Sequence, residues 1–383
     1  MRKVLAISIC ILFLFSLSGC WSANELNDFA YVLGLAIDKG KDGGDMLLTA
    51  QIAKPAELKP SAEGGGGSGK AYWNIRNEGD TFFYTIRGFS HESAHKLNFQ
   101  HNKIVIFSRE IAEEGVLEYI DFITRDNELR NVWLLVAQNK AADILEAEAE
   151  PDLEKIPSER IDKLVGTQEF SSETYTVKAL DFIKCLMGKT TSPVAPFIEI
   201  IGEGEEQKML MSGAAVFKKD KLVGELNRGE TRGLMWVTDK VKSGIIVVDC
   251  PGGEGKVEIE IMEASVTITP EIKDGAVRIK IEIKEKANIA SQSCRENLAT
   301  TEMFKLLESK QASVIRGEIT AAIKKARELN ADIFGFGEAV KREYPDQWSE
   351  LEDKWDNVFP NIEIEIMVEA EIYGTGKVSA PVN

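Results

Sequence analysis

Apolar and charged residues alternate along three segments in the last third of the chain, 257–261, 277–283 and 362–368. A period of two, apolar on one side and charged on the other, predicts antiparallel strands with one buried and one solvated face. Between the second and third segments, apolar residues recur every three or four positions over 294–329, which predicts a long helix. Its apolar stripe is wide enough to cover the sheet and comprises Phe304, Leu307, Ile315, Ile319, Ile323, Ala326 and Leu329.

The first half of the chain mixes strand and helix patterns. Segments 29–37 and 46–52 predict a hairpin across the turn rich in Gly and Asp between them. Apolar strands are predicted at 103–107 and 132–138, with helical segments before and after each of them. One of these helices is expected over 81–97, because the apolar residues of that segment gather on one side of a helical wheel: Phe82, Phe83, Ile86, Phe89 and Leu97.

The middle of the chain predicts a small unit with its own hairpin, 209–217 paired with 222–226. A short helix at 230–237 and a strand at 244–249 complete this unit. Taken together, the patterns predict an α+β fold of three mixed domains, with mainly antiparallel sheets packed against helices. The predicted ranges are a signal peptide at 1–19 and domains at 20–200, 201–254 and 255–383, the last with its sheet covered by the long helix.

The N-terminus has the organisation of an export signal. Arg2 and Lys3 precede an apolar run over 4–17, which has the length of a signal peptide and is too short to span a bilayer. The run ends in Leu-Ser-Gly-Cys at residues 17–20, which is typical of a lipobox. It predicts cleavage after Gly19 and attachment of a diacylglyceryl group to the thiol of Cys20. The alternative is an ordinary signal peptide with an incidental cysteine.

Charge and cysteine usage narrow the function further. A formal net charge of −16 argues against a nucleic-acid-binding surface, and it means that anionic lipid headgroups repel the body of the protein. Membrane contact therefore needs the lipid on Cys20. The three remaining mature cysteines, Cys185, Cys250 and Cys294, form neither a disulfide framework nor a zinc-binding set. We expect them to serve as three small apolar residues, and the alternative is a single disulfide between two of them.

All three histidines lie within twelve residues, as His91, His95 and His101. The first two belong to a His-Glu-x-x-His string, the spacing of a zinc-protease helix. On the predicted helix, however, His91 and His95 lie roughly opposite the apolar stripe and face solvent. A catalytic zinc site needs a walled cleft with ordered partners for its ligands, so an exposed helix is favoured over a protease.

Three passages resemble the Ger(x)C family, the lipoprotein C subunits of spore germinant receptors. The first is Gly-Cys-Trp at residues 19–21 with the Glu-Leu-Asn that follows, running into Gly-Leu-Ala-Ile-Asp at 34–38. The second is the middle hairpin over 213–226. The third is Ala-Asp-Ile-Phe-Gly-Phe-Gly at 331–337, followed by Pro345, Trp348, Trp355 and Phe359 before the final strand.

The third passage supplies a candidate structural or docking motif, formed by Asp332, Phe334, Gly335, Phe336, Gly337, Trp348 and Trp355. Gly335 and Gly337 follow a helix, which differs from a dinucleotide-binding loop and favours a tight turn between two helices. Phe334 and Phe336 are expected either to fill the core, the preferred interpretation, or to form a docking knob.

The resemblance implies a receptor subunit that works beside integral membrane A and B subunits. The residues themselves contain no nucleophile–base pair, no metal-ligand set and no cofactor loop, so we expect a non-enzymatic assembly subunit without cofactors, tethered by lipid to the outer face of the inner spore membrane. The alternative is a ligand-binding lipoprotein that delivers a small molecule to a transporter-like partner, which needs a cleft with convergent polar groups.

Overall fold

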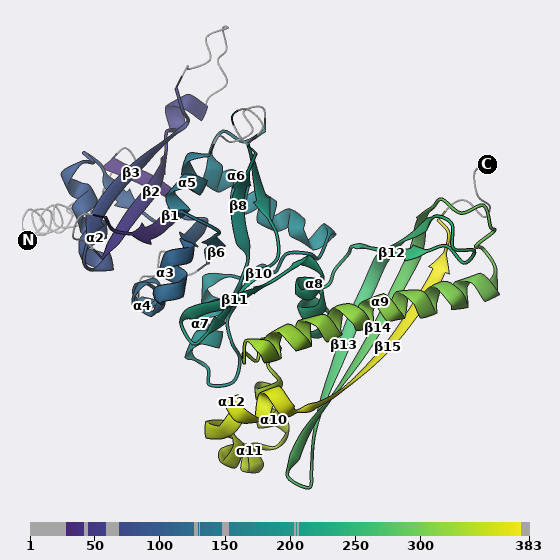
Figure 1. The fold of residues 1–383 in the computed structure, drawn as a ribbon. Helices are drawn as coiled ribbons and strands as arrows, with labels where there is room; N and C mark the ends of the chain where they lie inside the picture. Colours follow the sequence, from purple (N-terminus) through teal and green to yellow (C-terminus); the bar gives the residue numbers. More distant parts are fainter. Residues whose placement is uncertain are drawn as a thin grey trace, which may run out of the picture.

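The computed structural model describes residues 28–41, 45–58, 69–125, 129, 131–147, 153–202, 204 and 207–376. These residues form three sheets of eight, three and four strands. Figure 1 shows the sheets arranged in a row, with the N-terminal sheet at one end, the C-terminal sheet at the other and the three-stranded sheet between them. The mixed α+β architecture predicted from the sequence is confirmed.

The eight-stranded sheet is mixed in direction. Its strand order is β3-β2-β1-β5-β6-β8-β9, and β4 pairs alongside β1. Strands β1, β5, β6 and β8 run parallel, whereas β2, β3 and β9 are antiparallel to their neighbours. The predicted first hairpin is confirmed as β1 and β2. The strands are β1 (Phe29–Lys39), β2 (Met46–Ala53), β3 (Tyr72–Gly79), β4 (Lys96–Asn98), β5 (Ile104–Phe107), β6 (Trp133–Ala137), β8 (Phe197–Ile201) and β9 (Lys208–Met211).

Helices cover both faces of this sheet. On one face, α2, α3, α4 and α7 pack with Val105 and Leu134 of the sheet in one core cluster. On the other face, α5 and α6 pack with Ile106 and Leu135 in a second cluster. The helices are α2 (Phe82–Gly88), α3 (Arg109–Glu114), α4 (Leu117–Arg125), α5 (Ala141–Glu146), α6 (Pro157–Thr167) and α7 (Ala179–Met187).

The middle hairpin differs from the prediction in its first strand. The expected strand over 209–217 is interrupted at Gly213, whose φ of +71° turns the chain. Its first part is β9 of the large sheet, and its second part is β10 (Ala214–Lys218), which pairs with β11 (Lys221–Leu226) and β7 (Val194–Ala195). Along the sequence around residue 200, strands of the large sheet therefore alternate with strands of the three-stranded sheet. The predicted limits of the three domains stay a prediction.

The C-terminal sheet has the order β12-β13-β14-β15. Two features of this sheet differ from the prediction. Strand β12 (Ile245–Asp249) was assigned to the middle unit but pairs with β13 (Lys256–Lys273). Strand β15 (Glu363–Gly374) was expected to be antiparallel but runs parallel to β14 (Ala276–Gln292), because the helix between them carries the chain back across the sheet.

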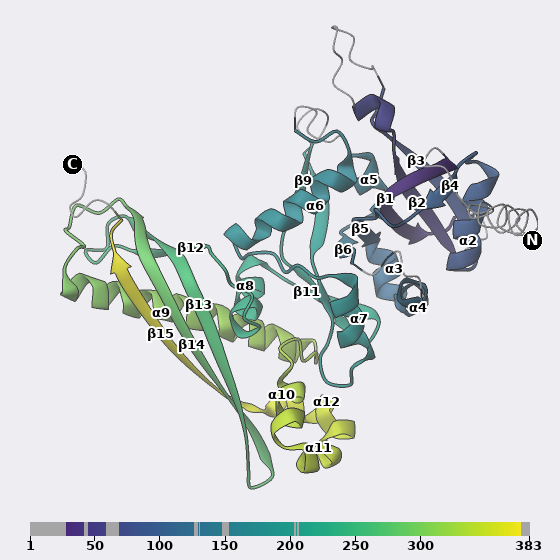
Figure 2. The ribbon, with the colours of Figure 1, turned by 180° about the vertical axis from the view of Figure 1, so that it is seen from behind.

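That connecting helix is α9 (Thr301–Glu328), which lies along the face of the four-stranded sheet (Figure 1). Its buried residues include Leu307, Ile315, Ile319, Ile323 and Ala326, as the predicted stripe required, whereas Phe304 and Leu329 are only half-buried. A shorter helix, α8 (Arg228–Val237), packs against α9. Viewed from behind in Figure 2, the short helices α10 (Phe336–Glu343), α11 (Pro345–Leu351) and α12 (Trp355–Val358) gather at the end of the sheet where β15 begins.

Candidate functional site

The histidine motif does not lie on one helix. Helix α2 ends at Gly88, His91 closes a short 3-10 turn over Phe89–His91, and His95 lies beyond it. The helix predicted over 81–97 was therefore too long, because the last part of the segment instead forms β4, which pairs with β1. His91, His95 and His101 are all exposed, and the His101 ring packs edge-on against Tyr31. This geometry differs from that of a zinc-protease helix.

The Asp332 carboxylate is the centre of the candidate motif in the third family-like passage. Its Oδ1 accepts hydrogen bonds from the backbone N–H groups of Phe334, Gly335 and Phe336, at 3.2, 3.0 and 3.1 Å. Its Oδ2 accepts from the Gly337 N–H at 2.8 Å and from the Trp355 indole N–H at 3.1 Å. One carboxylate thus satisfies five donors, and it ties the start of α10 to the start of α12.

The aromatic residues of the motif fill the space around this carboxylate. Phe334 and Phe336 are buried and stack on each other with ring centroids 4.9 Å apart, in agreement with the core interpretation. Trp348 and Trp355 are also buried, with centroids 5.2 Å apart. Gly335 has a φ of +75°, which permits the tight turn into α10. The structure therefore brings all seven residues of the motif into one cap, which we call the Asp332 cap.

The electrostatics of Asp332 suit a fixed structural anion. Burial raises its pKa to about 6, while the N–H groups of Gly337, Phe336 and Phe334 and the Trp355 indole act in the opposite direction by favouring the charged form. At neutral pH the carboxyl group is therefore ionised and fully hydrogen-bonded. The Asp332 cap also borders a polar cleft of about 390 Å³, lined in part by Lys189, Lys218 and Asp356.

The cysteines divide into three cases. Cys20 and Gly19, the predicted lipid-attachment and cleavage residues, lie outside the described residues, so both stay predictions. Cys250 and Cys294 form a disulfide between the end of β12 and the segment before α9. Cys185 is a half-buried free thiol whose pKa is raised by burial, so it lacks the thiolate character of a reactive cysteine.

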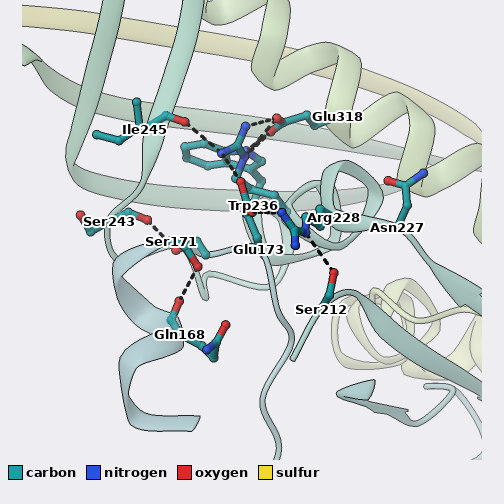
Figure 3. A network of polar contacts seen from close by, with 12 residues as sticks. Gln168, Ser171, Glu173, Ser212, Asn227, Arg228, Trp236, Ser243, Ile245 and Glu318 are labelled. Atoms are coloured by element: carbon teal, nitrogen blue, oxygen red, sulfur yellow. Dashed lines mark hydrogen bonds and ion pairs between the residues drawn. The ribbon is translucent and has the colours of Figure 1, made fainter. Parts of the chain in front are cut away.

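A polar network that the sequence analysis missed joins the N-terminal and C-terminal halves. The Arg232 guanidinium of α8 pairs with the Glu318 carboxylate of α9, and its Nε lies 3.0 Å from each carboxylate oxygen. The Trp236 indole N–H donates to the same carboxylate, as Figure 3 shows. Glu173, in the linker before α7, lies 3.9 Å from Arg232. The partners are too distant in sequence for any linear pattern to pair them.

Loss of the Arg232 charge is expected to destabilise this junction. Both paired side chains are almost buried, 11% and 12% exposed, so Arg232→Met leaves the Glu318 charge uncompensated. We expect a loss of about 3 kcal/mol in the free energy of unfolding, measured by urea denaturation. Arg228→Met is the matched control: Arg228 is 57% exposed, and its loss should cost less than about 0.5 kcal/mol. Equal losses in the two variants would contradict a special role for the Arg232 pair.

A second buried polar pair lies between β14 and α9. Gln311 donates from Nε2 to Glu285 Oε2 at 2.7 Å, and neither side chain is more than 1% exposed. Among the described residues, Glu285 Oε1 and Gln311 Oε1 have no hydrogen-bond partner. Burial raises the pKa of Glu285 to about 8. The sequence pattern could have revealed this pair. The alternation of inward positions in β14 continues through residue 285, and the buried stripe of α9 includes position 311 between Leu307 and Ile315.

The described residues contain neither a membrane-spanning helix nor a cluster of metal ligands. No helix there has the length and apolar character needed to cross a membrane. In the same residues, no three side chains of His, Cys, Asp or Glu lie close enough together to hold a metal ion.

Comparison with known proteins assigns the chain to a class. A family model described as "Spore germination protein N-terminal domain" matches residues 22–200, and one described as "Spore germination B3/ GerAC like, C-terminal" matches residues 212–376. Together the two models account for most of the chain, which is therefore a spore germination protein. More particularly, it belongs to the Ger(x)C family, and the resemblance seen in the sequence is confirmed.

Individual relatives are similar over nearly the full length. Spore germination protein KC of Bacillus subtilis (strain 168) is 25% identical over 402 residues, which cover 100% of this chain and 98% of the relative. Spore germination protein B3 of the same organism is 23% identical over 389 residues, covering 99% and 100%. The crystal structure of the GerBC protein matches with a TM-score of 0.56 at 19% identity, covering 89% of this chain and 97% of that one, and so shares the fold.

Proposed function

We propose that this protein is a membrane-tethered lipoprotein subunit of a spore germinant receptor, required for nutrient-triggered germination. It acts without enzymatic chemistry, by assembling with the integral membrane A and B subunits of the same receptor at the outer face of the inner spore membrane. The observation that carries the proposal is the lipobox ending at Cys20, at the end of an apolar signal segment in a member of a germination family.

The tether has a physical rationale. Two acyl chains give stable anchoring, whereas the charge of −16 would otherwise keep the body away from an anionic membrane. Confinement to the surface raises the effective concentration of the body beside integral partners, so that modest contacts suffice for assembly. The hydrogen-bond networks around Asp332 and Arg232 support this role. They hold the helices of the body in fixed positions, so that the body presents a constant surface to its partners.

Replacement of Cys20 tests the tether. Spores that carry Cys20→Ala should lose the protein from the membrane fraction, and pull-down should no longer recover polytopic receptor subunits. The germination response to nutrient should fall with it. Cys185→Ala is the matched control, because it removes a thiol from the folded body and should leave fractionation unchanged. Mass spectrometry of the native protein must also find acyl groups on residue 20; an unmodified, freely diffusing protein would refute the proposal.

A further inference from the structure

The parallel strands of the large sheet end together at one edge. After two neighbouring strands, the chain continues to opposite faces of the sheet. After β5 the chain enters α3, which packs on one face of the sheet. After the neighbouring strand β6 it enters α5, which packs on the other face. In open α/β sheets, the point where adjacent connections diverge in this way leaves a crevice at the carboxyl ends of the strands, and ligands bind there.

A hollow occupies this position. Its volume is about 450 Å³, within the range of small-molecule sites. Its walls are residues at or just after the ends of β1, β5 and β6, the first residues of α3 and α5, and Leu47 and Arg76 of β2 and β3. The lining includes Asp38, Arg109, Glu110, Asn139, Lys140 and Asp143. We call it the carboxyl-edge crevice. Sequence reasoning missed it because it depends on strand order, which no local pattern reveals.

The base of the crevice is held in place by hydrogen bonds. The Asp38 carboxylate is buried, and its two oxygens accept from the Ala141 and Ala142 N–H groups at 2.7 and 2.8 Å. The Arg109 guanidinium is oriented by Glu113 at 2.9 Å and by the Gln138 side-chain oxygen at 2.6 Å. These contacts fix the end of β1 against the start of α5, and the end of β6 against the start of α3.

The rim carries polar side chains that form no direct contacts with the rest of the fold. Among the described residues, the side chains of Glu110, Asn139, Lys140 and Asp143 form no hydrogen bond or ion pair with one another or with a neighbour, and all four line the crevice. Two of them are acidic, one is cationic and one is an amide. Further positive charges in the lining come from Lys39, Lys41 and Arg76, and from Arg109, which also pairs with Glu113 and Glu225. An ion of a single sign would therefore meet like charges as well as opposite ones.

We propose that the carboxyl-edge crevice binds a small zwitterion, a molecule with one carboxylate and one ammonium group on a short carbon frame, as in a free amino acid. Arg109 and Lys140 would receive the carboxylate, and Glu110 and Asp143 the ammonium group. The proposal is independent of the lipid tether, because it concerns only the N-terminal sheet. It gives the body a ligand-sensing capacity beyond assembly.

Calorimetry on the full purified chain tests the proposal, with each of the common L-amino acids as the probe. At least one should bind, and its methyl ester, which lacks the carboxylate, and its N-acetyl form, which lacks the ammonium group, should each bind at least about tenfold more weakly. Lys140→Gln and Asp143→Asn should each weaken binding of the intact amino acid by a similar factor. Lys305→Gln, an exposed substitution on α9, is the matched control and should leave binding unchanged.

Three results would overturn the proposal. The first is no binding of any amino acid at millimolar concentration. The second is that the two blocked derivatives, the methyl ester and the N-acetyl form, bind as tightly as the intact amino acid, and the third is unchanged binding of the intact amino acid in both crevice variants. Because Lys140 and Asp143 are exposed, their variants should keep the wild-type thermal midpoint. If either variant is destabilised, the blocked derivatives on the wild-type chain still decide the question. Binding should be the same with Cys20→Ala, so failure here and failure of the tether are distinguishable.

Discussion

Asp332→Ala should destabilise the protein by on the order of 5 kcal/mol, among the largest losses available from one side chain outside the apolar core. The substitution leaves five N–H donors without their acceptor in a buried site, and each such donor costs about 1–3 kcal/mol unless the structure relaxes. The measurement is urea denaturation followed by tryptophan fluorescence, since the Trp355 indole is one of the five donors. Near-ultraviolet circular dichroism should show whether the Trp348–Trp355 pair loses its packing.

Two variants separate this effect from a general loss of charge. Asp353→Ala removes an exposed carboxylate from the turn just before α12 and should change the free energy of unfolding by less than about 0.5 kcal/mol. Asp332→Asn preserves the shape but places an amide NH₂ where one carboxylate oxygen accepted hydrogen bonds, so it should be nearly as damaging as alanine. If Asp332→Asn leaves the free energy of unfolding unchanged, the donors do not depend on the second oxygen.

Glu285 should make the stability of the C-terminal sheet fall as pH rises. Its folded-state pKa of about 8 lies above the ordinary value of 4.5, so between these values the folded chain holds a proton that the unfolded chain has released. The free energy of unfolding therefore decreases from about pH 4.5 to about pH 8. At about 1.4 kcal/mol per pH unit, the loss between pH 5 and pH 8 is on the order of 4 kcal/mol. The protonated acid also supplies an O–H donor for the Gln311 carbonyl oxygen, which otherwise has no partner among the described residues.

Urea denaturation at intervals from pH 5 to pH 8 measures this slope. Glu285→Gln keeps the shape of the side chain and removes the titration, so the variant should show a flatter profile and exceed the wild type in stability at pH 8. Asp332, with a pKa of about 6, is mostly ionised by about pH 7, so the interval from pH 7 to pH 8 separates Glu285 from Asp332. Glu260→Gln, on the solvated side of β13, should follow the wild-type profile. Parallel profiles for the wild type and Glu285→Gln would rule out a neutral buried acid.

The parts of the fold that follow from local pattern were predictable. Alternation located β13, β14 and β15, and the stripe of apolar residues located α9, because these periodicities express which side of an element is buried. The same alternation, continued by one position, would have placed Glu285 inside. The aromatic and glycine residues of the Asp332 cap were also recognised from the sequence as one motif.

The features that depend on the arrangement of distant segments were not predictable from those patterns. The direction of β15 depends on the path of α9 across the sheet, and a strand has the same alternation whether its neighbour is parallel or antiparallel. Arg232 and Glu318 are 86 residues apart, so their pairing depends on how α8 and α9 pack. The five donors around Asp332 likewise become visible only when the turn and α12 have been placed in space.

The position of β15 has a consequence for synthesis of the protein. This strand lies at the end of the described chain and pairs along β14 from Arg278↔Glu363 to Asn288↔Gly374. Until the ribosome has released those last residues, the long flank of β14 has no partner, and an unpaired flank of this kind invites association between chains. A premature stop codon just upstream of position 363 would therefore be expected to yield aggregated material, despite sparing the rest of the polypeptide.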